Sequence, residues 1–142
     1  MDLMVTGHRP QRLYGKDEEV RIWLAKYIRE LKPDRCISGM AAGVDRIFAR
    51  EVIKQDIPLL CYYPFLKEKF SQEEQNILDN AASVIFTQSE YSKDCFYKRD
   101  CKMVDDSDVV LVVWDGIPAG GTYLTMEYAK EQNKEMYIYM LK

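Results

Sequence analysis

The sequence predicts an α/β fold, in which a single Rossmann-like, doubly wound, mainly parallel sheet is flanked by helices. Two observations lead to this prediction. Along the whole chain, short apolar runs of strand length alternate with stretches whose apolar residues recur at helical spacing. One run, residues 109–114, is apolar at every position, as in a parallel-sheet strand with both faces covered. We therefore expect one domain over residues 1–142, with this run as a central strand and right-handed crossovers.

The first half of the chain supplies three predicted strands and two predicted helices. The apolar run at 3–5 predicts a strand, because the stretch GHRP that follows it interrupts regular structure. The apolar stripe that contains Val20, Leu24 and Ile28 predicts a helix from about residue 16, and Pro33 sets its end. The next predicted elements are a strand at 35–38, a helix over 44–52 and a strand at 57–63.

The second half continues the alternation. Ser71 and Glu74 have the spacing of a capping box, which predicts the start of a helix that carries Ile77, Leu78 and Ala81. The remaining predicted elements are a strand at 83–87, a helix at about 93–106, the strand at 109–114, a helix at about 122–132 and a final strand at 136–140.

Composition restricts the class of partner and the location. The chain has 142 residues, of which 47% are hydrophobic and 30% charged, as is typical of a globular domain. A net charge of −3 gives no global attraction to nucleic acid or anionic lipid, so nucleic acid is disfavoured as a partner and any anion site must be local. No apolar run approaches the roughly 18 residues of a membrane span. We expect a cytoplasmic protein with no membrane partner.

The histidine and cysteine content gives no sign of a metal site. His8 is the only histidine, and the four cysteines contain no C-x-x-C pair. Cys36 and Cys61 fall in predicted strands, where a reduced cysteine packs as a small hydrophobic residue. We expect no metal, and we assign no cofactor.

Three glycine-containing loops follow predicted strands: TGHRP at 6–10, SGMAAGVD at 38–45 and DGIPAGGT at 115–122. In a doubly wound sheet, ligands bind at the carboxyl ends of the strands, where the winding reverses. Glycine beside a helix start exposes backbone N–H groups that attract phosphate, whereas close helix-strand packing is the alternative explanation of Gly39 and Gly43. The predicted ligand-binding residues are Thr6, Gly7, His8, Arg9, Ser38, Gly39, Met40, Ala41, Gly43, Asp45, Asp115, Gly120, Gly121, Thr122 and Thr125.

Several of these side chains have two interpretations. Asp45 either caps a helix dipole or holds a ribose hydroxyl, and Asp115 is either a hydrogen-bond partner at a strand end or a sugar ligand. His8 is a turn residue that packs or caps. Arg9 adds a charged fork that suits phosphate or carboxylate.

Two further groups of residues are interpreted from their neighbours. The aromatic residues Tyr62, Tyr63 and Phe65 either wall the crevice and stack on a base, or belong to the core or its rim. The basic residues of the 93–106 helix alternate with acids, which predicts a solvated helix face. These basic residues are Lys93, Lys98, Arg99 and Lys102.

Four motifs stand in order along most of the chain: TGHRP, SGMAAGVDRIFARE, KRDCKMVDDSDVVLVVWDG and GGTYLTMEYAKEQ. Together they resemble the YpsA-like branch of the SLOG superfamily, a Rossmann-like group that includes the DNA-processing protein DprA and the LOG phosphoribohydrolases. The resemblance implies that the loops bind a nucleotide-type small molecule, such as a nucleoside phosphate, a nucleotide sugar or an ADP-ribose-type compound, in a sensor. It is also compatible with a homodimer.

The chain departs from the LOG pattern P-G-G-x-G-T-x-E-E, in which an acid soon after the threonine assists glycosidic cleavage. Here the nearest acid after Thr122 is Glu127, which is rotated by about 200° around the helix from Thr125 and is expected to point away from the ligand. We therefore assign no catalytic residue, and whether the protein is an enzyme stays open.

Two alternative functions remain. The first is an N-glycosidic hydrolase of nucleoside monophosphates, for which Asp45, Asp115 or Glu127 would have to act as the catalytic acid. The second is a DprA-like protein that binds single-stranded DNA, which the acidic charge balance and the missing basic stripe disfavour.

Overall fold

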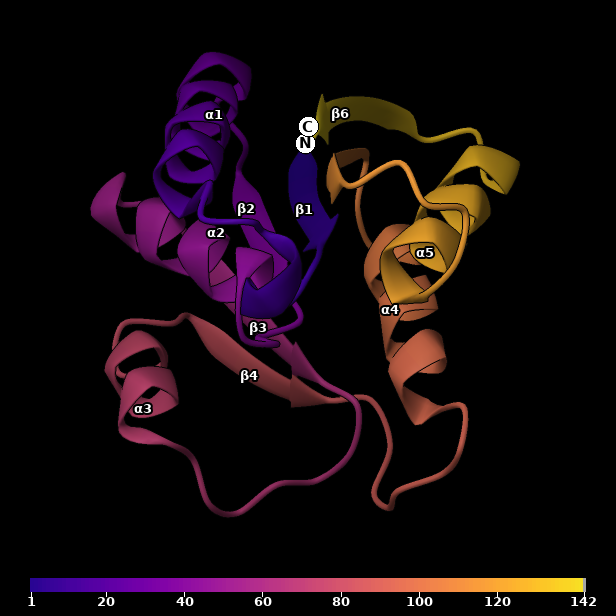
Figure 1. The fold of residues 1–142 in the computed structure, drawn as a ribbon. Coiled ribbons are helices and arrows are strands. Elements are labelled where there is room, and N and C mark those ends of the chain that lie inside the picture. Colours follow the sequence, from indigo (N-terminus) through magenta and orange to yellow (C-terminus); the bar gives the residue numbers. More distant parts are fainter. Residues whose placement is uncertain (142) are drawn as a thin grey trace.

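A six-stranded parallel sheet forms the centre of the computed structural model, which describes residues 1–141 (Figure 1). The strand order is β4-β3-β2-β1-β5-β6, and every neighbouring pair is parallel. The strands are β1 (Asp2–Gly7), β2 (Arg35–Ser38), β3 (Leu59–Tyr63), β4 (Ser83–Phe86), β5 (Val109–Trp114) and β6 (Glu135–Met140). The predicted fold class is confirmed. However, β5 lies next to the edge strand β6 and not in the middle of the sheet.

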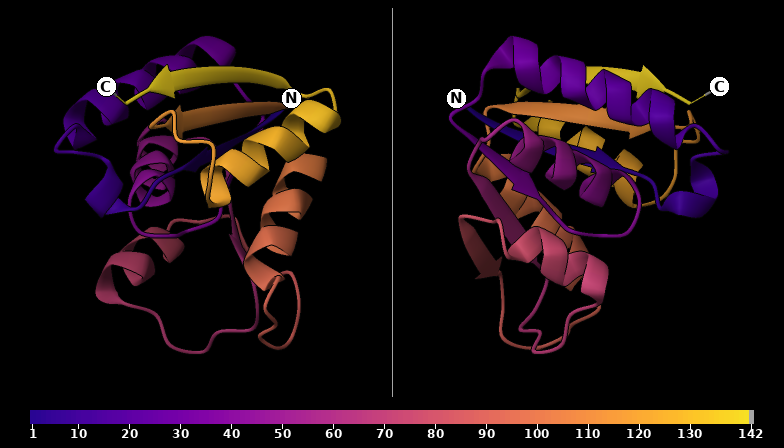
Figure 2. Two further views of the ribbon diagram at one scale, coloured as in Figure 1. Left: turned by 45° about the vertical axis from the view of Figure 1, so that its right-hand side comes forward. Right: turned by 90° about the vertical axis from the view of Figure 1, so that its left-hand side faces the viewer.

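Helices cover both faces of the sheet (Figure 2). One layer contains α1 (Asp17–Leu31), α2 (Val44–Lys54) and α3 (Gln72–Leu78), and the other contains α4 (Cys95–Asp105) and α5 (Gly121–Glu131). In β5, Val109, Leu111 and Val113 pack toward the first layer, whereas Val110 and Val112 pack toward the second. The strand is apolar throughout because both of its faces are buried.

Local signals determine several helix ends. The side chain of Ser71 accepts the N–H of Glu74 at 3.1 Å, and the carboxylate of Glu74 accepts the N–H of Ser71 at 3.0 Å, so the predicted capping box is confirmed. Lys32 has a φ of 49° and ends α1 before Pro33, as predicted. Helix α3 ends at Leu78, so Ala81 lies outside it.

The third strand begins two residues later than predicted. The N–H of Ile57 donates to the carbonyl of Val52, so Ile57 still belongs to the turn that closes α2. Pro58 cannot donate a hydrogen bond to the sheet, and the strand starts at Leu59. The other predicted strands and helices are present, with ends that differ by one or a few residues.

The winding of the sheet reverses between β1 and β5. From β1 the chain moves outward through β2, β3 and β4, and α4 then returns it across the sheet to β5 on the other side of β1. The loops that follow β1 and β5 therefore leave the sheet toward opposite layers and separate, which creates a crevice at their carboxyl ends.

Neither a membrane-spanning helix nor a metal-binding cluster is present within residues 1–141. No helix there combines the length and the apolar composition that a membrane crossing requires. No group of three histidine, cysteine, aspartate or glutamate side chains is arranged to hold a metal ion in this part of the chain. All four cysteines are free, and Cys101 is the one among them that is not fully buried.

Candidate functional site

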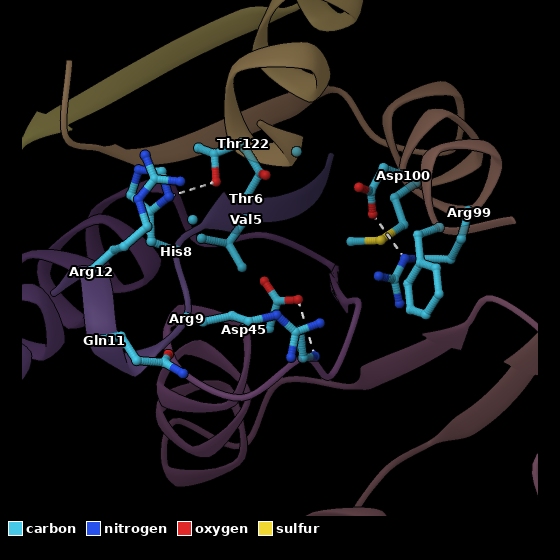
Figure 3. Close-up of a pocket in the computed structure, with 15 residues that line it drawn as sticks. Val5, Thr6, His8, Arg9, Gln11, Arg12, Asp45, Arg99, Asp100 and Thr122 are labelled. Carbon is cyan, nitrogen blue, oxygen red and sulfur yellow. Dashed lines mark hydrogen bonds and ion pairs between the residues drawn. The ribbon is translucent and has the colours of Figure 1, made fainter. Parts of the chain in front are cut away.

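A cavity of about 500 Å³, the main cavity, opens at the carboxyl end of the sheet where the winding reverses (Figure 3). Its walls come from the end of β1 and the 3₁₀ turn Pro10–Arg12, the start of α2, one face of α4 and the first turn of α5. A second cavity of about 200 Å³ adjoins it. The two cavities share Arg9, Ala41, Phe96 and Arg99 as lining residues.

The predicted ligand-binding residues fall into three groups. The main cavity is lined by Thr6, Gly7, His8, Arg9, Ala41, Asp45, Gly121 and Thr122. The second cavity is lined by Gly39 and Met40, together with Arg9 and Ala41. Neither cavity is lined by Ser38, Gly43, Asp115, Gly120 or Thr125. The structure thus brings all three loops together, but it places several of their side chains behind the cavity wall.

The glycines of the three loops have different roles. Gly43 has a φ of 99°, and a Cβ there would lie 2.4 Å from the carbonyl oxygen of His8. A Cβ at Gly7 would lie 2.6 Å from the Cβ of Val44. These two glycines allow helix α2 to pack against the end of β1. Gly121 differs, because no atom lies within 4 Å of the position that its Cβ would occupy.

The first turn of α5 presents free backbone donors to the main cavity. Gly120 caps this helix without a side-chain hydrogen bond, and no acidic residue lies in the first turn. Within residues 1–141, the N–H groups of Gly121, Thr122 and Tyr123 donate no hydrogen bond. This end of α5 therefore carries the positive end of a helix dipole together with unpaired N–H groups.

The loop at 38–45 uses its own backbone donors internally. The N–H of Met40 donates to the hydroxyl of Ser38 at 3.1 Å, and the N–H of Ala41 donates to Oδ2 of Asp45 at 3.2 Å. The hydroxyl of Ser38 donates in turn to the carbonyl of Asp45 at 2.8 Å. The donors of Met40 and Ala41 are therefore already paired, in contrast to those of α5.

His8 is buried and bridges β1 to β5 and α5. Its Nε2 accepts the N–H of Asp115 at 3.2 Å, and its Nδ1 lies 3.3 Å from the hydroxyl of Thr122. Burial and the charge of Arg12 lower the pKa of His8, so the ring is neutral at pH 7. Nε2 also lies 3.3 Å from Oδ1 of Asp115, so both ring nitrogens are engaged, and the tautomer determines which partner of the Nδ1 contact with Thr122 is the donor. His8 thus orients the hydroxyl that faces the cavity.

Asp115 is a hydrogen-bond partner at a strand end, which is one of the two roles predicted for it. Its carboxylate accepts Nε of Arg12 at 3.0 Å and the N–H of Ile117 at 3.1 Å. Burial raises its pKa, but the N–H of Ile117 and the guanidinium of Arg12 outweigh this effect and hold the pKa below its usual range. Its side chain is only 3% exposed and lies outside the lining of both cavities.

Arg99 does not lie on a solvated helix face, so that prediction was wrong for this residue. Its Nη1 donates to the carbonyls of Gly39 at 2.6 Å and Tyr62 at 3.0 Å. Gly39 directly follows β2, and Tyr62 is the last residue but one of the neighbouring strand β3. Its Nε donates to Oδ1 of Asp100 at 2.8 Å. Figure 3 shows Arg99 and Asp100 at one side of the main cavity, with His8 and Thr122 at the other.

Asp45 lies in the wall of the main cavity, and its pKa is well above the usual value of an aspartate. Burial raises its pKa to about 7, Arg99 opposes this increase, and the charge of Asp100 adds to it. Burial also raises the pKa of Asp100. The cavity therefore contains two carboxyl groups that bind protons more tightly than they would in water.

We expect the free energy of unfolding to depend on the ionisation of Asp45. The folded protein keeps a proton that the unfolded chain releases near pH 4, so stability should fall as the pH rises from about 4 to about 7. Asp45→Asn should reduce the loss between pH 5 and pH 8 by about 2 kcal/mol. Urea unfolding at both pH values measures this, with the exposed Asp56→Asn as control. An equal pH dependence in Asp45→Asn and the parent would contradict the raised pKa.

Sequence reasoning missed seven residues that line the main cavity: Val5, Gln11, Arg12, Phe96, Arg99, Asp100 and Met103. A signal for Arg99 was present, since it lies four residues after Cys95 and four before Met103, and all three are buried. No local pattern predicts Arg12, because its partner Asp115 is 103 residues away.

The aromatic residues at the end of β3 and in the loop after it divide between the core and the second cavity. Tyr62 and Tyr63 are each 4% exposed, and their hydroxyls donate to Asp106 and Glu74. Tyr63 and Phe65 line the second cavity. Both tyrosines therefore belong to the core, and Phe65 lies at the crevice.

Helix α5 contains Thr125 and Glu127, the two residues compared above with the LOG pattern. The hydroxyl of Thr125 is buried, 2.8 Å from the carbonyl oxygen of Gly121 and 3.2 Å from Oδ2 of Asp100. Glu127 does not line the main cavity. The acid that follows the threonine in the sequence is therefore absent from the cavity wall.

A family model described as the circularly permutated YpsA SLOG family matches residues 36–142. The matched range begins at β2, so β1 and α1, with the His8 and Arg9 loop between them, precede it. In a search of curated proteins, no sequence matches the chain.

Solved structures share the fold at low sequence identity. DNA processing protein A (DprA) from Streptococcus pneumoniae has a TM-score of 0.76 and 16% identity, over 96% of this chain and 49% of that chain. This chain thus spans about half the length of the pneumococcal protein. The DprA from Helicobacter pylori, described with a single-stranded DNA binding mode, has a TM-score of 0.74 and 18% identity over 97% and 64%. The molybdenum cofactor carrier protein from Chlamydomonas reinhardtii has a TM-score of 0.69 and 16% identity, over 96% of this chain and 74% of that chain.

Proposed function

Because the chain belongs to the circularly permutated YpsA SLOG family, we propose that its main cavity binds a nucleotide or a nucleotide-derived ligand, in a sensor that recognises the ligand by its phosphate and ribose. The family match confirms the SLOG relationship that the four motifs predict. The nature of the ligand is our proposal, and it rests on the chemistry of the cavity wall.

The observation that carries the proposal is the presence of two unpaired positive groups in the wall of the main cavity. One is the first turn of α5, with its free N–H groups and the open space beside Gly121. The other is Arg9, which within residues 1–141 donates no hydrogen bond and forms no ion pair with a carboxylate. A phosphate at this position would accept hydrogen bonds from both.

The carboxyl groups of the cavity wall suit a sugar. Asp45 and Asp100 line the main cavity, and carboxylate oxygens accept hydrogen bonds from ribose hydroxyls. The volume of about 500 Å³ lies within the range of small-molecule sites, about 300–1,000 Å³. A ligand that combines an anion with hydroxyl groups therefore matches both the hydrogen-bond donors and the hydrogen-bond acceptors of the cavity wall.

Arg9→Gln tests the phosphate contact. We expect it to weaken binding of the preferred nucleotide at least about tenfold, because a charge-assisted hydrogen bond contributes roughly 1.5–3 kcal/mol. The matched control is Arg29→Gln, which changes another exposed arginine that forms no ion pair within residues 1–141 and lies outside both cavities. Isothermal titration with a panel of nucleoside phosphates, nucleotide sugars and ADP-ribose measures both variants.

The panel also decides the proposal as a whole. Saturable binding that raises the melting temperature in proportion to the logarithm of ligand concentration supports it. If no member of the panel binds or stabilises the parent protein, the proposal is wrong. If Arg9→Gln and Arg29→Gln bind equally well, the phosphate does not lie at Arg9.

Asp45 favours one alternative, N-glycosidic hydrolysis of a nucleoside monophosphate. A carboxyl group with a pKa of about 7 in a cavity wall is suited to general acid-base catalysis near neutral pH. Asp115 is fully paired and Glu127 lies outside the cavity, so Asp45 is the acid that this alternative requires. Release of free base during incubation with the same panel distinguishes hydrolysis from binding alone.

The DprA structures motivate one further arm of the panel. The Helicobacter pylori protein is described with a single-stranded DNA binding mode. A labelled single-stranded oligonucleotide should bind this chain weakly, because its net charge is −3. Tight, salt-dependent oligonucleotide binding would favour the DNA-binding alternative.

A further inference from the structure

We infer that the second cavity is a subsite for a nucleobase, so that the ligand lies across both cavities, with its phosphate at α5 and its planar ring between α4 and the loop after β3. This inference rests on the proposed function. It adds that the ring itself is recognised, and that a sugar phosphate without a base is a poor ligand.

The two cavities form one continuous site. They share four lining residues, and Arg9 and Ala41 are among them. The shared residues separate the phosphate side, at Gly121 and Thr122, from the side formed by Pro64 and Phe65. A molecule bound at α5 can therefore extend past Arg9 into the second cavity without crossing the protein interior.

Apart from Arg9, at the boundary with the main cavity, the cations of the second cavity are already paired. Nζ of Lys67 lies 3.0 and 2.9 Å from the two oxygens of Glu74. Nη1 of Arg46 donates to Glu73 at 2.5 Å, and its Nε donates to the carbonyl of Met40 at 2.9 Å. Arg99 pairs with Asp100, so Arg9, the residue proposed to contact the phosphate, is the one lining cation of this cavity without an ion pair within residues 1–141. The second cavity therefore suits a neutral group.

Aromatic rings border the same cavity. Phe65 and Phe96 line it, with ring centroids 6.4 Å apart and planes at 84°. Tyr91 meets Phe65 in the same way, at 5.8 Å and 87°. These rings meet at right angles and are not stacked face to face, and Phe96 remains 43% exposed. Exposed aromatic faces bind bases by stacking.

Arg99 holds Phe96 in place at the boundary of the two cavities. Its guanidinium carbon lies 5.9 Å from the centroid of the Phe96 ring, and its Nη1 is fixed by the carbonyls of Gly39 and Tyr62. The ring is therefore supported by a buried group and is pre-positioned for a ligand, which lowers the entropic cost of binding.

The test compares ligands with and without a base, and uses two variants of α4. AMP, GMP and ribose 5-phosphate are titrated calorimetrically into the parent, Phe96→Leu and Tyr97→Leu. Tyr97 is the matched control, because it is an aromatic residue of the same helix with 41% exposure and it packs against Tyr128 outside both cavities. Leucine keeps an apolar side chain but removes the aromatic face.

We expect AMP or GMP to bind the parent at least about tenfold more tightly than ribose 5-phosphate. Phe96→Leu should remove most of this ratio while ribose 5-phosphate affinity changes less than about twofold, and Tyr97→Leu should preserve the ratio. The ratio is independent of a general loss of stability. Equal affinities for all three ligands, or equal ratios in the two variants, would overturn the base subsite while leaving phosphate binding intact. Failure of all three ligands to bind overturns the base subsite, whereas the proposed function falls only if every member of the wider panel also fails to bind.

Discussion

Gly43→Ala should lower the free energy of unfolding by about 4 kcal/mol, which corresponds to a fall of about 12 °C in melting temperature for a chain of this size. Two effects add at this position. The φ of 99° is strained for any residue with a Cβ, and the new Cβ would lie 2.4 Å from the carbonyl oxygen of His8 and 2.9 Å from the Cα of Arg9. Both neighbours are backbone atoms, so neither can rotate away.

Two other glycines separate these effects. Gly15 has a φ of 73° and no atom within 4 Å of the place that a Cβ would take, so Gly15→Ala carries the backbone strain without a collision. Gly121 has neither a positive φ nor a close neighbour, so Gly121→Ala should leave the melting temperature nearly unchanged. Thermal unfolding of the three variants should therefore give Gly43→Ala far below Gly15→Ala. Similar melting temperatures for these two would show that the contact between the β1 loop and α2 yields easily.

The fold was predictable because its signals are local. Periodicity reports which faces of a segment are buried, and β5 alternates between two helical layers at every residue. The capping box of α3 lies within four residues of sequence. The position of β5 in the strand order was not predictable in this way, since burial on both faces applies to any interior strand of a parallel sheet.

The site was predictable only to the level of its loops. The rule that strand ends share one edge brought the loops of β1, β2 and β5 together. It could not separate Gly121, which faces open space, from Gly43, which faces the backbone of His8. Side-chain roles depend on partners distant in sequence, as for Arg99, whose hydrogen bond to Gly39 spans 60 residues. Charge patterning along one helix does not reveal such a partner.

Arg99 is the second position where we expect a large effect. Its side chain is 6% exposed, and it satisfies the carbonyls of Gly39 and Tyr62 and the carboxylate of Asp100. Arg99→Met keeps an apolar stem but leaves these three acceptors without their donor. Removal of one partner from a buried ion pair costs about 3–5 kcal/mol, so we expect a loss of about 4 kcal/mol in urea unfolding.

The neighbouring Lys98 provides the control for this prediction. Its side chain is 62% exposed and pairs with Asp94 at 3.4 Å, so Lys98→Met should change the free energy of unfolding by no more than about 0.5 kcal/mol.

A second measurement separates the electrostatic role of Arg99 from its packing. Because the charge of Arg99 lowers the pKa of Asp45, Arg99→Met should raise that pKa further above about 7, as followed by carboxyl NMR titration. Arg99→Lys keeps the charge but not the planar fork of the guanidinium. We therefore expect its Asp45 pKa to stay close to that of the parent, and its free energy of unfolding to lie between those of the parent and Arg99→Met. If Arg99→Met matched Lys98→Met in both measurements, Arg99 would not hold the wall between the two cavities.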